Sequence, residues 1–146
     1  MARIYILALL LILAAANIHA EDGVKCQLTV YQYDEASQKD IKIYEDTSVF
    51  KNNLPATGFI GPFSLEIAFK KIDSSGVTFD IHVITLGAKV NTYSRLFSMD
   101  YELPARLSGI EGKHGSKYSL VIMPLSMVET DEGCDFNHRT AESFSS

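Results

Sequence analysis

Two adjacent segments of alternating apolar and polar residues constrain the fold of this chain most strongly. In residues 63–69 and again in residues 77–83, every second residue is a large apolar one. A β-strand with one buried face has this period of two, because successive side chains point to opposite faces of the sheet. Residues 73–76 between the two segments read DSSG, which is typical of a tight turn. The pattern therefore predicts a β-hairpin that supplies the centre of a hydrophobic core.

Further strand signals recur along the chain, with turns between them. Residues 24–31 alternate in the same way, and residues 41–44 form a shorter alternating segment. Residues 117–125 are apolar on both faces near their middle, which is typical of a central strand. We therefore predict an all-β domain, a single antiparallel β-sandwich of about six or seven strands, with a small β-barrel as the alternative.

Two other segments carry weaker signals. Residues 51–62 contain the pairs Asn-Asn, Leu-Pro, Thr-Gly and Gly-Pro, which interrupt regular structure, so we predict a long ordered loop there. Residues 90–99 mix aromatic and hydroxyl side chains and are interrupted afterwards by Pro104. The turn-like residues 111–116 contain His114 between glycines, where it reads as an ordinary turn residue.

The first 20 residues have the composition of a secretory signal peptide. Arg3 gives a positive start, residues 4–16 are almost entirely apolar, and the small Ala20 precedes two acidic residues. The apolar run is shorter than the about 20 residues that a membrane-spanning helix needs. We predict a signal peptide over residues 1–20 that is cleaved after Ala20, and a secreted or periplasmic protein whose mature chain has no membrane span. The mature chain then divides into a β-sandwich domain over residues 21–126 and a polar, acidic C-terminal tail over residues 127–146.

The charge of the mature chain argues against nucleic acid as a partner. Removal of Arg3 leaves 12 basic and 18 acidic side chains, a formal charge of −6. Binding to phosphates requires clustered Lys and Arg, whereas the only adjacent basic pair is Lys70-Lys71. We therefore predict no nucleic-acid partner.

The two cysteines, Cys26 and Cys134, lie near opposite ends of the mature chain. In the oxidising compartment to which a signal peptide leads, such a pair predicts a structural disulfide that ties the first strand to the tail. A metal site with His138 and a pair of free thiols are the alternatives.

Two groups of residues suggest a catalytic or metal-binding site, and each also has a simpler interpretation. His82 follows Asp80 at strand spacing, which is the arrangement in which a carboxylate orients an imidazole as a general base, but no nucleophile in a recognisable motif accompanies them. His138 lies in an acidic segment, where hard cations find oxygen ligands, but the spacing matches no calcium loop. Solvated surface residues explain both groups, so we predict no catalytic, cofactor-binding or metal site.

Tyrosines provide the strongest candidate for an interaction surface. Tyr31 and Tyr33 lie on the outward face of the first predicted strand, and Tyr44 lies on the next one. Exposed aromatic residues are enriched at protein interfaces. These three residues therefore predict an interaction patch, unless a second sheet or the loop of residues 51–62 covers them.

Together these observations favour a non-enzymatic exported β-sandwich module. We expect it to bind a protein or an envelope component, or to self-associate through an exposed strand edge. Two alternatives remain, a small hydrolase that uses His82 with Asp80 or a metal at His138, and a carrier of a small apolar ligand. The carrier would require a cavity in place of a packed core. That cavity would be lined by Phe63, Leu65, Phe79 and Ile81.

Overall fold

A computed structural model describes residues 21–86 and 90–130 of the protein. Eight strands and one short 3₁₀ helix make up most of this described part. They are β1 (Glu21–Asp34), β2 (Lys39–Lys51), β3 (Ala56–Ile60), β4 (Phe63–Asp73), β5 (Gly76–Leu86), β6 (Val90–Met99), β7 (Ala105–Glu111), η1 (Lys113–Gly115) and β8 (Lys117–Thr130).

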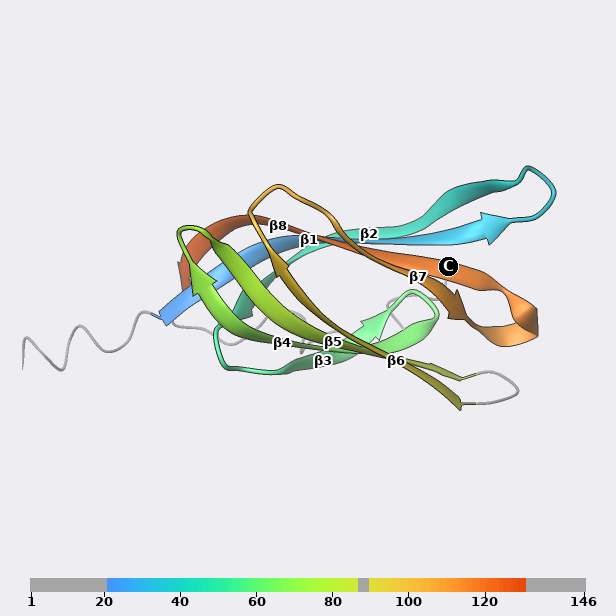
Figure 1. The fold of residues 1–146 in the computed structure, drawn as a ribbon. Coiled ribbons are helices and arrows are strands. Elements are labelled where there is room, and N and C mark those ends of the chain that lie inside the picture. The colour runs from blue at the N-terminus through green and yellow to red at the C-terminus, as the bar shows by residue number, and fades with distance from the viewer. Residues whose placement is uncertain (1–20, 87–89, 131–146) are drawn as a thin grey trace, which may run out of the picture.

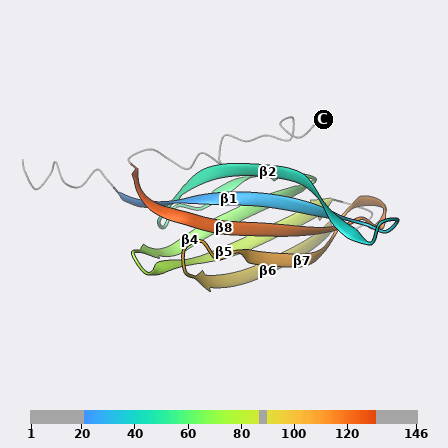
Figure 2. The same cartoon turned by 90° about the horizontal axis from the view of Figure 1, so that it is seen from above.

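The strands form two antiparallel sheets that lie face to face (Figures 1 and 2). The first sheet has the order β2-β1-β8-β7, and the second has the order β3-β4-β5-β6. The predicted all-β class is confirmed, with eight strands in place of the predicted six or seven. The barrel alternative is wrong, because each sheet ends in two edge strands and neither closes on itself. The predicted signal peptide lies outside the described residues and stays a prediction.

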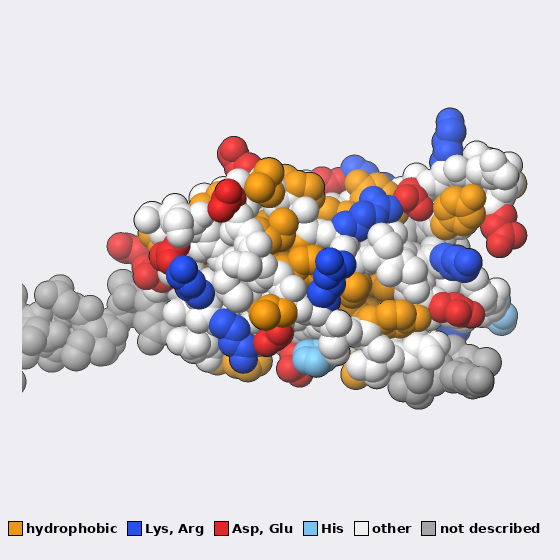
Figure 3. Space-filling view, in the orientation of Figure 1, with side chains coloured by type: hydrophobic (Ala, Val, Ile, Leu, Met, Phe, Trp, Pro, Cys, Tyr) orange, Lys and Arg blue, Asp and Glu red, His pale blue; other side chains and the backbone are white. Residues whose placement is uncertain are grey.

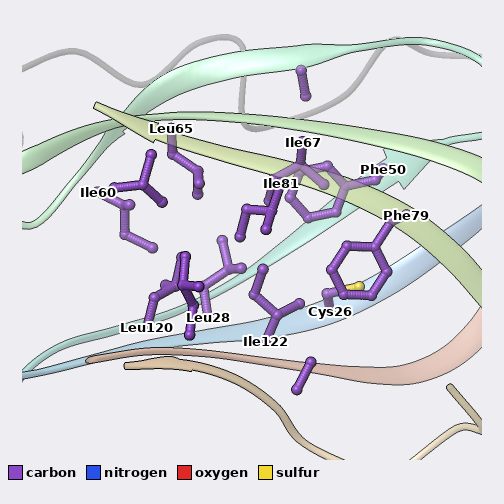
Figure 4. Close-up of a cluster of buried hydrophobic side chains, with 14 of the residues drawn as sticks. Cys26, Leu28, Phe50, Ile60, Leu65, Ile67, Phe79, Ile81, Leu120 and Ile122 are labelled. Carbon is purple, nitrogen blue, oxygen red and sulfur yellow. The ribbon is translucent and has the colours of Figure 1, made fainter. Parts of the chain in front are cut away.

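The core fills the space between the sheets, as the alternation of the strands requires (Figure 4). Phe79 of β5 lies at its centre, between the rings of Phe69 on β4, with centroids 5.0 Å apart, and Phe97 on β6, 5.4 Å away. Phe50 on β2 extends this row of rings to the first sheet, 5.3 Å from Phe69. The row runs from one sheet to the other, so it holds the two layers together.

Three side-chain hydrogen bonds also connect segments that are distant in the sequence. Thr85 Oγ1 on β5 donates to the carbonyl of Glu111, 2.8 Å away, and the N–H of Glu111 donates to Tyr93 Oη at 2.9 Å. Glu111 ends β7, so these bonds fix the start of the β7–β8 turn against the second sheet. At the opposite end of the sandwich, Tyr101 Oη donates to the carbonyl of Asp73 at 2.6 Å.

The prediction of a long loop over residues 51–62 is wrong in part. β2 continues to Lys51, and Ala56–Ile60 forms the edge strand β3, paired with β4. An edge strand is paired on one side only, so it tolerates Gly58 and nearby prolines that would disrupt a central strand. β8 likewise runs to Thr130, beyond the predicted start of the tail at residue 127.

Candidate functional site

The two strands of the β1–β2 hairpin have more residues than any strand of the sheet that faces them. β1 and β2 have 14 and 13 residues, whereas the strands of the second sheet have 5 to 11. The hairpin end therefore lies at one end of the molecule, beside the β7–β8 turn (Figure 1). Tyr33, Ile41 and Ile43 in this segment are 41%, 48% and 44% exposed, and Figure 3 shows apolar side chains there among charged ones.

Tyr44 does not share a surface with the other two predicted patch residues. The register between β1 and β2 shifts between Val30 and Tyr31, where a bulge adds one residue to β2. As a result Tyr44 pairs with the buried Val30 and packs against the core, with its hydroxyl donating to Asp46 Oδ2 at 3.2 Å. Tyr31 and Tyr33 remain together on the outer face of the first sheet.

Tyr31 and Tyr33 differ in how much of each aromatic ring is free to contact a partner. The guanidinium carbon of Arg106 on β7 lies 5.6 Å from the centre of the Tyr31 ring. Arg106 is held there by Asp40 Oδ2, 2.6 Å from its Nη2, and by Ser108 Oγ, 3.1 Å from its Nε. One face of Tyr31 is therefore covered, and Tyr33 is the more exposed aromatic residue of the pair.

A shallow hollow lies between the hairpin and the β7–β8 turn. Its volume is about 190 Å³, and its lining includes Tyr33 and Glu35 from the hairpin and His114 and Lys117 from the turn. His114 has a left-handed backbone, with φ of 58° and ψ of 25°. This conformation costs a non-glycine residue about 1–2 kcal/mol, so the turn presents an exposed imidazole at the expense of some stability.

Three other acidic side chains near the hairpin end, those of Asp34, Asp40 and Glu45, accept hydrogen bonds from neighbouring side chains. Hydrogen bonds from the Ser37 side chain and backbone to Asp34 lower the pKa of that carboxyl and fix the tip of the hairpin. Lys42 donates to Glu45, which raises the pKa of the lysine and lowers that of the glutamate. Glu35, His114 and Lys117 line the hollow itself.

His82 and Asp80 share the outer face of β5, as predicted, but they do not act as a pair. Asp80 lies 3.7 Å from Lys70 Nζ, whereas His82 Nδ1 lies 2.5 Å from Ser94 Oγ on β6. This serine contact depends on the β5–β6 register, so no local sequence pattern predicts it. The contact lies on an exposed sheet face, where water reaches both side chains, so the geometry lacks the enclosed pocket that the hydrolase hypothesis requires.

The described residues contain no group of three or more His, Cys, Asp or Glu side chains arranged to hold a metal ion. His138 lies outside them. In the same part of the chain, no helix is long and apolar enough to cross a membrane.

Cys26 is completely buried among the core side chains (Figure 4) and forms no disulfide within the described residues. Burial raises the pKa of this thiol. Cys134 lies outside the described residues, so the disulfide stays a prediction. Thr130 pairs with Glu21 at the end of the sheet. Along β1, Cys26 lies about 17 Å from Glu21. The four residues that follow Thr130 up to Cys134 reach at most about 14 Å when fully extended. The bond therefore requires a nearly extended chain that turns back at once after Thr130 and enters the space between the sheets.

Comparison of the chain with protein-family models, with curated proteins and with solved structures found no match.

Proposed function

We propose that the protein is an exported, non-enzymatic β-sandwich module that binds a protein or an envelope component through the end of its β1–β2 hairpin. The observation that carries this proposal is that the hairpin end exposes apolar side chains on both of its faces: Tyr33 on the outer face of the first sheet, Ile41 on the opposite face, and Ile43 at the bulge of β2. Exposed apolar side chains beside polar ones are characteristic of the centre and rim of binding surfaces.

The size and chemistry of the adjacent hollow favour a macromolecular partner over a small molecule. Sites for small molecules usually enclose about 300–1,000 Å³, whereas the hollow has about 190 Å³. A volume of this size suits one protruding side chain of a partner. Glu35, His114 and Lys117 at its border offer both charges and hydrogen-bond donors for such a group.

The carrier hypothesis receives no comparable support from the core. The side chains of Phe63, Leu65, Phe79 and Ile81 are at most 2% exposed, and all four belong to the packed cluster between the sheets. Packed side chains at these positions leave the proposal of a binding module as the better explanation.

Affinity capture tests the proposal. The secreted, tagged protein would serve as bait, and the captured proteins, together with any lipid or metal in the same sample, would be identified by mass spectrometry. We expect a partner that is retained by the unaltered protein and lost by the double variant Tyr33→Ser/Ile41→Ser. The matched control is Leu103→Ser, which removes a side chain that is 50% exposed in the β6–β7 connection at the other end of the molecule.

Two results would contradict the proposal. Capture of the same partner by the double variant would show that the hairpin end is not the contact surface. A stoichiometric lipid without a protein partner would favour the carrier instead. Circular dichroism of each variant would verify that its fold is unchanged, which we expect because both replaced side chains are largely exposed.

A further inference from the structure

The second sheet ends in an edge strand, β6, that is unusually regular. Its ten residues pair with β5 without a register shift, and it contains neither proline nor glycine. Within the described residues, its free edge has no backbone hydrogen-bond partner. A row of unpaired N–H and C=O groups of this length is a template for pairing with another strand.

The other three edges in the described part of the chain are less suited to strand pairing. β3 has five residues, and β7 is interrupted by a register shift that contains Gly109, with φ of 75°. β2 carries the bulge opposite Val30 and Tyr31, and residues in its second half make further interactions. Short strands and bulges are devices that prevent edge-to-edge association, and β6 has neither.

The side chains of β6 identify a second copy of this chain as the partner. Leu96 points away from the core and is 60% exposed, more than any other large hydrophobic side chain in the described residues. In an antiparallel pairing of β6 with itself, a twofold axis at Leu96 places the two Leu96 side chains opposite each other. The same register pairs Ser94 with Ser98, and Tyr93 with Met99, so each pair is chemically compatible.

Arg95 distinguishes this register from its neighbours. Its guanidinium carbon already lies 4.9 Å from the centre of the Phe97 ring on its own strand. With the axis at Leu96, Arg95 faces the Phe97 of the other copy, so the cation–aromatic contact is repeated across the interface. An axis at Arg95 would instead oppose two like charges, which destabilises a strand pair.

We propose that two copies of the protein associate through β6, antiparallel and with the axis at Leu96, so that their second sheets form one continuous eight-stranded sheet. This surface is separate from the hairpin end, so the inference goes beyond the proposed function and does not depend on it. One strand pair buries less surface than a typical stable interface, so we expect a dimer that dissociates on dilution.

Sedimentation velocity over a range of concentrations tests the association. We expect the mature protein to shift from monomer to dimer as its concentration rises, and Leu96→Lys to remain monomeric because the register would oppose two ammonium groups. Met127→Lys, which adds the same charge to a 42% exposed position on β8, is the control and should dimerise normally. A monomer at every concentration, or a dimer that persists in Leu96→Lys, would overturn the proposal.

Disulfide trapping tests the register, and it applies even if Leu96→Lys fails to fold. In a Cys134→Ser background, Leu96→Cys should form a covalent dimer on oxidation, because directly opposed strand residues lie within disulfide distance. Ser94→Cys alone should remain uncrosslinked, whereas a mixture of Ser94→Cys and Ser98→Cys proteins should form a covalent heterodimer. Efficient crosslinking of Ser94→Cys with itself would overturn the register.

Discussion

Replacing Phe79 with alanine should remove the central ring of the core and lower the free energy of unfolding substantially. Phe79 has no exposed surface and contacts the rings of Phe69 and Phe97. Truncation of a buried phenylalanine costs about 3–5 kcal/mol through lost transfer energy and the cavity left behind. Because two aromatic contacts disappear as well, we expect a loss in the upper half of this range. A domain of this size is typically stable by about 5–15 kcal/mol, so the variant should lose a large fraction of its stability.

Urea denaturation monitored by circular dichroism would measure this loss, with Phe59→Ala as the matched control. Phe59 is the same residue type on the edge strand β3, but it is 37% exposed on the outer face of the second sheet. We expect the control to lose less than about 1.5 kcal/mol, because much of that side chain already contacts water. If both variants lost the same free energy of unfolding, and the slope of that free energy with urea concentration were unchanged, the assignment of Phe79 to the centre of the core would be refuted.

The structure predicts three further outcomes. Tyr44→Ala should destabilise the protein by about 2 kcal/mol or more in the same assay, whereas Tyr33→Ala should change its stability by less than about 0.5 kcal/mol; equal effects would contradict the placement of Tyr44 against the core. The pKa of Asp73 is lowered from 3.8 to about 2, chiefly by hydrogen bonds from the Ser75 side chain and backbone. Its contribution to stability should therefore be complete above pH 3.8 and be lost as the pH falls toward 2. NMR titration of this carboxyl checks the lowered pKa, and a titration midpoint near 3.8 would contradict it. Non-reducing peptide mapping should find the two cysteines linked, and after reduction the buried Cys26 should resist alkylation until the protein unfolds; rapid alkylation of Cys26 in the folded protein would contradict its burial.

The strands that alternate strictly could be predicted from the sequence. In β4 and β5, every second side chain up to Phe69 and between Val77 and Val83 is large and apolar, and the DSSG turn joins two strands of equal length. The local alternation and the tertiary packing agree in this hairpin, so the sequence pattern alone predicts both strands and the turn between them. β3 was missed because its five residues contain a glycine and lie among prolines, a pattern that only an edge position permits.

The candidate site was less predictable, because it depends on register and on contacts between distant segments. A bulge reverses the side-chain phase of β2 relative to β1, and this packs the partly buried Tyr44 against the core although its sequence spacing suggested the surface. The hollow beside Tyr33 forms only because the hairpin end lies next to the β7–β8 turn. This turn is distant in the sequence, since its Gly112 follows Tyr33 by 79 residues. Nothing in the local sequence around His114 indicates this neighbour.

The affinity of the captured partner for hairpin variants tests the central claim most directly. Isothermal titration calorimetry would compare the unaltered protein, the double variant Tyr33→Ser/Ile41→Ser and the control Leu103→Ser. If the hairpin end is the binding surface, the double variant should bind at least about 30-fold more weakly, the loss expected when exposed aromatic and apolar anchors are removed, and the control should bind normally. Unchanged affinity in the double variant would contradict the claim that the hairpin end binds the partner.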